Sequence, residues 1–544
     1  MKRTAVFLVS ALFLISLGYM PLLLSSDHIE PYATVSEAAF AVQNSNESEQ
    51  LIMNHINYST FIGGNEHEET GSIAVDRFGC VYITGITESP DFPLVNAYDN
   101  TMGGNQDCFV SKFSADGSEL LYSTFIGGQS SEHGSSIAVD SSGCAFVTGV
   151  TESSDFPTVN AYDRTYEGGL ECFVFKLSAD GSELLYSTLV GGAESDYASS
   201  IAIDSWGNAF VTGRTESSDF PTVNTFGSTN TGGSGGCFVF KLSADGSELL
   251  YSTLIGGTES EDASSIAVDS SGNAFVTGRT TSPDFPIVNA FGDIIQGGSE
   301  CFVFKLSADG SELLYSTFIG GVESDYASSI AIDSSGNAFV TGNTESSDFP
   351  TVNAFNETIG GWTDCFVFKL SADGSELLYS TFIGGVEFDY AKSIAIDSSG
   401  IAFVTGITES SDFPMVNAFD STIEGGCCST DCFVFKLSAN GSNLVYSTFI
   451  GGQYSDCATS IAIDETGGVF IGGSTESADF PIINGYDSTY ERIGDCFVLK
   501  LTLRADVEAI STDEPIVPIE WLVISAGTVG VAMVAVIVIL LKRE

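Results

Sequence analysis

Seven carboxylates recur along the chain at one position of a repeated motif, and they are the residues best suited to chemistry. Each lies four residues after the second glycine of a Gly-Gly pair: Glu68, Glu132, Asp196, Glu261, Asp325, Asp389 and Asp456. Carboxylates that converge on one axis repel one another and attract cations, and Ca²⁺ takes six to eight oxygen ligands. Two interpretations stay open: a solvated acidic rim that maintains solubility, and a ring that binds Ca²⁺ or a basic partner segment. No other cofactor is predicted, and no Asp-x-Asp-x-Asp-Gly loop for Ca²⁺ is present.

The sequence offers little for catalysis. Of the four histidines, only His67 and His133 fall in loops of the repeats, and neither belongs to a Ser-His-Asp or Cys-His motif. A zinc site of His67, Glu69 and His133 is disfavoured, because scattered loop histidines are usually bystanders. We therefore predict that the protein is not an enzyme. The alternative is a pair of acids acting in hydrolysis, which would have to break the symmetry of the repeats.

The composition indicates a large folded core and excludes one class of partner. The 544 residues include 18 Lys+Arg and 71 Asp+Glu, a formal net charge of -53, yet 43% of the chain is hydrophobic. A disordered chain would be less hydrophobic. Because the acidic excess repels phosphate backbones, nucleic-acid binding is excluded, and any charged partner is expected to be cationic.

Three motifs repeat seven times through the middle of the chain. Asp-Phe-Pro and Cys-Phe-Val keep the same period as Tyr-Ser-Thr, which begins at Tyr58, Tyr122, Tyr186, Tyr251, Tyr315, Tyr379 and Tyr446. The steps are 64, 64, 65, 64, 64 and 67 residues, and the last is longer because of extra residues near Cys427 and Cys428. A fixed period of this length indicates a repeat architecture.

Each repeat predicts four short strands. In the second copy, strands at 136–140 and 144–149 flank one tight turn, and strands at 172–177 and 183–189 flank another. Such a sheet is apolar on both faces, so it must be sandwiched between neighbours, which a radial arrangement of seven achieves. We predict an all-β, seven-bladed β-propeller of four-stranded antiparallel blades, in which residues near 57–62 complete the seventh blade. The seven carboxylates would lie just before the innermost strands, around the mouth of the central channel.

The motifs also carry a family resemblance. The segments Tyr-Ser-Thr-Phe-Ile-Gly-Gly, Ile-Ala-Val-Asp-x-x-Gly-Asn-Ala-Phe-Val-Thr-Gly and Asp-Phe-Pro, over residues 51–503, resemble the bacterial seven-bladed β-propeller repeat family. The resemblance implies a propeller fold and a prokaryotic cell-surface location. It brings no single activity and no set of catalytic residues.

Other recurrent residues are assigned structural roles. We expect the Asp at the end of each first strand, such as Asp76, to act in the hairpin turn, and the Asp of Asp-Phe-Pro to organise its loop. The lysine of each third strand, such as Lys112, is expected to pair with a blade carboxylate. Most of the 12 cysteines are interpreted as buried packing residues, since the predicted strands separate them by more than the roughly 7 Å that a disulfide allows. One bridge among Cys427, Cys428 and Cys457 is a hypothesis.

Both ends of the chain predict membrane segments. Residues 1–26 indicate a signal peptide or signal anchor, and residues 27–50 a linker to the propeller at 51–503. A stalk at 504–520 leads to an uncharged transmembrane helix at 521–541, and Lys542 and Arg543 lie in a cytoplasmic tail at 542–544. The expected location is the cell membrane, with a single span, an extracellular propeller and a cytoplasmic C-terminus.

The predicted function is that of a membrane-anchored extracellular propeller for non-enzymatic binding, adhesion or scaffolding. Its long loops, on one face of the rigid scaffold, would contact a surface protein, a glycan or a cationic partner. The alternative is an extracellular hydrolase or lyase with its site at the channel mouth of the long-loop face. The sequence does not predict an oligomeric state.

Overall fold

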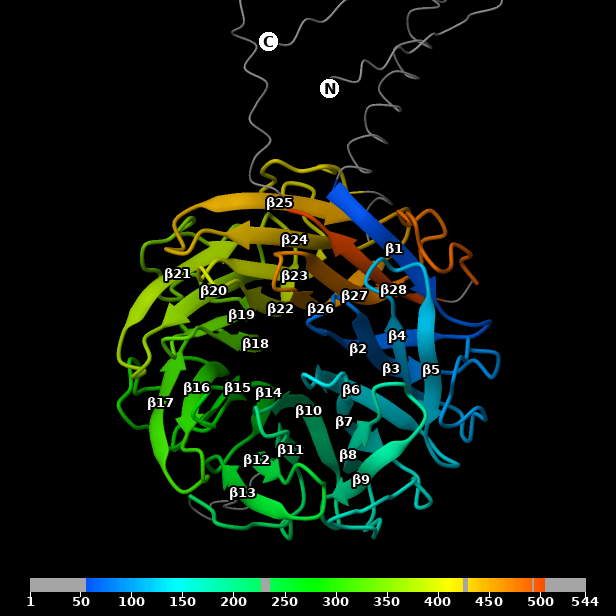
Figure 1. The fold of residues 1–544 in the computed structure, drawn as a ribbon. Helices are drawn as coiled ribbons and strands as arrows, with labels where there is room; N and C mark the ends of the chain where they lie inside the picture. Colours follow the sequence, from blue (N-terminus) through cyan, green and yellow to red (C-terminus); the bar gives the residue numbers. More distant parts are fainter. Residues whose placement is uncertain (1–54, 227–234, 424–428, 492–493, 504–544) are drawn as a thin grey trace, which may run out of the picture.

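The described part of the chain forms seven four-stranded antiparallel sheets arranged around a central axis (Figure 1). The structure is a computed structural model, and it describes residues 55–226, 235–423, 429–491 and 494–503. The predicted all-β, seven-bladed propeller is therefore confirmed. The predicted signal segment, linker, stalk, transmembrane helix and tail lie outside the described residues. Within the described ranges, no helix has the length and apolar character to cross a membrane.

Each blade has four strands, which in blades 1 to 6 follow the order of the chain from the axis outward. The innermost strands are β2 (Glu68–Val75), β6 (Glu132–Val139), β10 (Asp196–Ile203), β14 (Glu261–Val268), β18 (Asp325–Ile332), β22 (Asp389–Ile396) and β26 (Asp456–Ile463). The second strands are β3 (Val81–Thr87), β7 (Ala145–Thr151), β11 (Ala209–Thr215), β15 (Ala274–Thr280), β19 (Ala338–Thr344), β23 (Ala402–Thr408) and β27 (Val469–Thr475).

The outer half of each blade follows the same plan. The third strands are β4 (Asp107–Phe113), β8 (Glu171–Leu177), β12 (Gly236–Leu242), β16 (Glu300–Leu306), β20 (Asp364–Leu370), β24 (Asp431–Leu437) and β28 (Asp495–Leu501). The outermost strands are β5 (Leu120–Ile126), β9 (Leu184–Val190), β13 (Leu249–Ile255), β17 (Leu313–Ile319), β21 (Leu377–Ile383), β25 (Leu444–Ile450) and, in blade 7, β1 (Ile56–Ile62).

The N-terminal strand closes the ring as predicted. β1 pairs antiparallel with β28, with Tyr58 opposite Lys500 and Ile62 opposite Cys496, and the two strands lie side by side in Figure 1. The first described strand of the chain therefore completes the last blade, and β28 has a partner on both edges.

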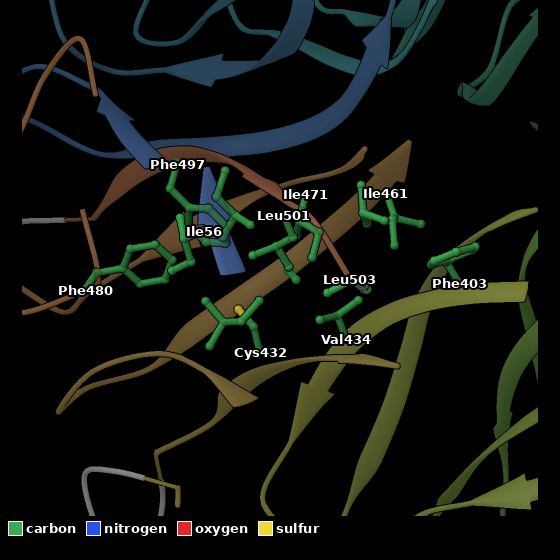
Figure 2. Close-up of a cluster of buried hydrophobic side chains, with 14 of the residues drawn as sticks. Ile56, Phe403, Cys432, Val434, Ile461, Ile471, Phe480, Phe497, Leu501 and Leu503 are labelled. Carbon is green, nitrogen blue, oxygen red and sulfur yellow. The ribbon is translucent and has the colours of Figure 1, made fainter. Parts of the chain in front are cut away.

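The core lies between the blades, because each sheet presents an apolar face to each neighbour. Figure 2 shows one such layer, in which Phe403 and Val434 of blade 6 pack with Ile461 and Phe497 of blade 7. All four are at most 6% exposed. The third strands are buried on both faces, which explains why their middle is an apolar run, such as Cys172-Phe-Val-Phe in β8, followed by a lysine.

The innermost strands begin about four residues earlier than predicted. β6 starts at Glu132, which pairs with Thr151 of β7, and a β-bulge between Gly134 and Ser136 absorbs the change of register. The same bulge recurs in the other six blades. The seven carboxylates are therefore the first residues of the innermost strands, and the expectation that they precede these strands is wrong.

The long loop after each second strand returns along the outer edge of its own blade. In blade 1, Val95 and Ser123 exchange two backbone hydrogen bonds of 3.2 and 2.7 Å, and Asn96 follows in the left-handed region at φ 49°. Equivalent bridges occur in blades 2 to 6. The loop thus covers part of the edge of the outermost strand.

Candidate functional site

The predicted ring of seven carboxylates is buried, so the expectation of a solvated acidic rim is wrong. Glu68, Glu132, Asp196, Glu261, Asp325, Asp389 and Asp456 are each 0–1% exposed. Asp325 shows the reason: its Oδ2 accepts hydrogen bonds from the backbone N of Gly321 at 2.7 Å and from Ser346 Oγ at 3.0 Å. Each carboxylate thus holds the Gly-Gly turn that connects two blades, instead of facing the channel. Whether the ring binds a ligand stays a prediction.

Burial dominates the electrostatics of this ring. Desolvation raises the pKa of Asp325 to about 6 and that of Asp389 to about 7, although hydrogen bonds from threonine, glycine and serine lower it. In the described part of the chain, no group of three or more His, Cys, Asp or Glu side chains is arranged to hold a metal ion. This includes His67, Glu69 and His133, which the sequence analysis already disfavoured.

The structural roles assigned to other recurrent residues are confirmed. Lysine and the hairpin aspartate form ion pairs in six blades: Lys112–Asp76, Lys176–Asp140, Lys241–Asp204, Lys305–Asp269, Lys369–Asp333 and Lys500–Asp464. Asp76 Oδ1 also accepts the backbone N–H groups of Phe78 and Cys80 in its turn. In the Asp-Phe-Pro motif, Asp155 accepts a hydrogen bond from the backbone of Gln129, which organises the loop.

The cysteines also match their predicted role. Those of the Cys-Phe-Val motifs are free and fully buried, at Cys108, Cys172, Cys237, Cys301, Cys365, Cys432 and Cys496. Cys457 is a free, partly buried thiol at the start of β26. Cys427 and Cys428, the other members of the hypothetical bridge, lie outside the described residues.

The structure points to a site that the sequence analysis missed, a cavity on the propeller axis. Its lining includes Glu69, Asp262, Tyr326 and Cys457, each the residue that directly follows one of the buried carboxylates. Residues of six blades contribute to the wall, so this axial cavity, of about 560 Å³, is shared by almost the whole ring. Four of the seven copies of one position therefore line the same cavity.

The axial position breaks the symmetry of the repeat. Its seven occupants are Glu69, His133, Tyr197, Asp262, Tyr326, Tyr390 and Cys457. The carboxylate one residue earlier is Asp or Glu in every blade, whereas this position carries an acid, an imidazole, a phenol or a thiol. A comparison of the copies for positions at which the residues differ in chemical character would have included this one. Motifs defined by identity between the copies do not include this position.

One wall of the axial cavity carries an ordered charge network. Arg279 donates from Nε and Nη2 to Asp262 Oδ2, at 3.0 and 2.7 Å, and its guanidinium lies 5.2 Å from the ring centroid of Tyr326. Arg214 Nε lies 3.9 Å from Asp262 Oδ1. The network connects blades 3, 4 and 5 and holds the Tyr326 ring beside a fixed cation.

The opposite wall has a lysine and a thiol but no activated nucleophile. Burial raises the pKa of Cys457, and the neighbouring ammonium of Lys392 offsets this only in part, so the thiol stays protonated at neutral pH. His133 occupies the same position in blade 2 but is not among the residues that line the cavity, and burial lowers its pKa against the effect of Glu69. The axial cavity is therefore suited to hydrogen bonding and stacking with a ligand.

Hollows of similar size lie at the outer rim, and they repeat with the blades. One of about 590 Å³ is lined by Asn289, Lys305 and Tyr315, and one of about 510 Å³ by the equivalent Asn224, Lys241 and Tyr251. Since both arise from the same residues of the repeat, they are features of the scaffold. The axial cavity differs because equivalent positions contribute chemically different residues to it, such as Glu69, Tyr326 and Cys457.

A comparison with known protein families supports the β-propeller fold. Residues 185–221, 250–286, 314–350 and 445–481 match a family of β-propeller repeats named SBBP. The chain carries the SBBP β-propeller repeat. The four matched segments each run from the outermost strand of one blade to the Asp-Phe-Pro loop of the next. No curated protein matches the chain.

Solved structures with similar folds are distant in sequence. The WD40 β-propeller domain of Doa1 is 10% identical, covering 82% of this chain and 98% of its own, with a TM-score of 0.41. BamB from Moraxella catarrhalis is 9% identical, covering 80% and 83%, with a TM-score of 0.34. XC5397 from Xanthomonas campestris, a gluconolactonase, is 12% identical, covering 61% and 82%, with a TM-score of 0.29.

Proposed function

We propose that this protein is a non-enzymatic binding module whose ligand enters the axial cavity. The observation that supports this is the chemical variation at one position of the repeat: Glu69, Asp262, Tyr326 and Cys457 line one cavity although they occupy equivalent places. A position with a purely structural role is expected to keep one type of residue in every blade, as the preceding position does with its seven carboxylates. Variation at the point where six blades meet is typical of a ligand site on a symmetric scaffold.

The chemistry of the axial cavity favours a glycan over a cationic partner. Two acids, Glu69 and Asp262, are matched there by two bases, Arg279 and Lys392, so the cavity has no excess negative charge despite the net charge of the chain. Hydroxyl groups of Ser199, Ser264 and Ser328 supply further polar contacts, and the Tyr326 ring supplies a stacking surface. Aromatic and hydroxyl groups beside a fixed ion pair suit a polyhydroxylated ligand.

The proposal places the propeller outside the cell. The predicted transmembrane helix at 521–541 would hold the domain at the membrane, so the axial cavity would meet ligands at short range. A surface adhesin or scaffold fits this arrangement. The alternative of a hydrolase receives less support, because burial raises the pKa of the Cys457 thiol in the axial cavity and so disfavours the thiolate nucleophile.

A glycan array with the full-length chain in mild detergent tests this function. We expect a defined set of glycans to bind, and Tyr326→Ala to weaken binding at least about tenfold, which corresponds to about 1.4 kcal/mol. The matched control is Trp206→Ala, which removes an aromatic side chain that is 67% exposed in a hairpin turn on the opposite face. Equal loss in both variants, or release of a cleaved product from the bound glycan, would contradict the proposal.

A further inference from the structure

The junction between blades 5 and 6 departs from the other junctions at three positions of the repeat. Directly before the innermost strand, blade 6 has Phe388, where five blades have serine and blade 1 has His67. At the fourth residue of that strand it has Lys392, where the other blades have serine, threonine or glycine. Two residues before the third strand, blade 5 has Trp362, and the other blades have Asn105, Gly169, Ser234, Gly298, Ser429 and Ile493. The three departures occur together, beside the axial cavity that Lys392 helps to line.

Backbone contacts bring the loop of Trp362 against the start of blade 6. The backbone N–H of Asp389 donates to the carbonyl oxygen of Thr363 at 2.9 Å, and Thr363 pairs with Phe388 in a parallel bridge. The backbone of Gly361 also lies close to the connecting turn, since an added Cβ would be only 2.7 Å from the carbonyl carbon of Val386. Trp362 and Val386 therefore belong to adjacent segments, and their side chains are 71% and 54% exposed.

A stack of side chains continues from these segments toward the axis. The rings of Phe388 and Tyr390 are parallel within 2°, with centroids 6.2 Å apart, and both side chains are half-buried. The ammonium of Lys392 lies 5.8 Å from the ring centroid of Tyr390. The aromatic surface, which we define as Trp362, Val386, Phe388 and Tyr390, thus leads from the long-loop face to Lys392 in the wall of the axial cavity.

The charged groups beside the aromatic surface suit a ligand rich in hydroxyl groups. Within the described residues Lys392 forms no ion pair, so its N–H donors are available to a ligand. Burial, and then the carboxylates of Glu409 and Glu345, raise the pKa of Tyr390, so both acids act on its ring from nearby and can accept hydrogen bonds. Exposed apolar side chains that are contiguous and rimmed by polar groups mark an interaction surface.

From this arrangement we infer that the ligand is an oligosaccharide of several units, with one unit in the axial cavity and the next units stacked on the aromatic surface. The apolar faces of sugar rings pack on flat aromatic side chains, while their hydroxyl groups bond to carboxylates and to an ammonium. Lys392 contacts the unit at the cavity, and Trp362 contacts the outermost unit. This inference rests on the proposed function, to which it adds the length of the glycan and the direction in which it leaves the cavity.

A glycan array on which each linear glycan is printed with two, four and six units tests the inference, using the full-length chain in mild detergent. We expect Phe388→Ser to weaken the binding of the four-unit and six-unit glycans at least about tenfold, and that of the two-unit glycans less than about twofold. The variant introduces the residue that five other blades carry, and Trp362→Asn, with the residue of blade 1, should act in the same direction. Circular dichroism confirms that each variant is folded.

The matched control is Tyr454→Ser, which removes an aromatic side chain that is 60% exposed on the same face, in the turn between blades 6 and 7. It should bind glycans of every length as the unmodified protein does. If Tyr454→Ser loses as much binding as Phe388→Ser, the effect belongs to the whole face and the inference is wrong.

The array separates this inference from the function on which it rests. If Tyr326→Ala weakens binding while Phe388→Ser and Trp362→Asn bind every length normally, the aromatic surface takes no part, and the axial cavity remains the glycan site. Affinity that does not rise from two units to four would overturn the inference in the same way. If the unmodified protein binds no glycan, both the proposed function and this inference are wrong.

Discussion

The closing strand β1 provides the sharpest test of the fold. It comes from the N-terminal end of the propeller sequence, whereas the other three strands of its blade, β26 to β28, come from the C-terminal end. Phe61 in β1 and Phe382 in β21 occupy the same position of the repeat, and both are 1% exposed. The Phe61 ring packs against Phe480 and Tyr490 at centroid distances of 6.2 and 6.0 Å, and the Phe382 ring against Phe349 at 6.1 Å. Each ring packs against the phenylalanine of the Asp-Phe-Pro motif in its own blade, so the two rings should make similar contributions to the free energy of unfolding.

Replacing either phenylalanine with alanine leaves a cavity between two blades. Burial this complete predicts that Phe61→Ala and Phe382→Ala each lower the free energy of unfolding by about 3–5 kcal/mol. Denaturant unfolding of the full-length chain in mild detergent, followed by far-ultraviolet circular dichroism, measures both. The two losses should agree within about 1 kcal/mol, since Phe382→Ala reports the cost inside an ordinary blade.

A small loss in Phe61→Ala alone would refute the closure argument. If Phe61→Ala cost less than about 1 kcal/mol while Phe382→Ala cost the full amount, β1 would detach without unfolding the remaining blades. The ring would then be open in solution, and β28 would expose an unpaired edge. A small loss in both variants would instead mean that the blade core relaxes around the cavity.

Three further predictions concern single positions. Gly467→Ala should lower the free energy of unfolding by only about 1–2 kcal/mol, because φ is +81° but nothing lies within 4 Å of the new Cβ. Gly374→Ala should lower it clearly more, since the new Cβ would lie 2.4 Å from Tyr315 Cγ. Thermal unfolding compares the two variants. Burial acts to raise the pKa of Asp333, but hydrogen bonds from Asn337 and the ammonium of Lys369 outweigh it and lower the pKa below 3.8. A lowered pKa stabilises the fold above 3.8 and the effect is lost on acidification, so Asp333→Asn should destabilise the protein at pH 7 and much less at pH 2.5; an equal effect at both would contradict the ion pair. Cys237, fully buried with a raised pKa, should not react with a thiol reagent at pH 8 until denaturant is added, and rapid labelling in the native state would show that its blade opens.

The architecture was readable from the sequence because the signals for it are local. Turn residues such as Asp180-Gly181, apolar runs such as Cys172-Phe-Val-Phe, and a fixed period need only neighbouring residues to define a blade, and the position of Tyr58 ahead of the first complete copy was enough to predict the closure. That Lys112 pairs with a carboxylate of its blade was predicted for the same reason, and the structure identifies that carboxylate as Asp76.

The environment of the acids was decided by the tertiary structure. Asp325 looks like a surface residue in sequence, after two glycines and before a polar strand, yet it is buried because the β-bulge and the third strand of the preceding blade enclose it. Its neighbour Glu300 lies 25 residues earlier, in another blade, so no local pattern links the two. The axial cavity arises in the same way: Glu69 and Tyr326 are 257 residues apart and share a wall only because the ring closes. Sequence periodicity defines each blade, but which side chains meet between blades depends on packing across the ring, and it is there that the axial cavity and the aromatic surface lie.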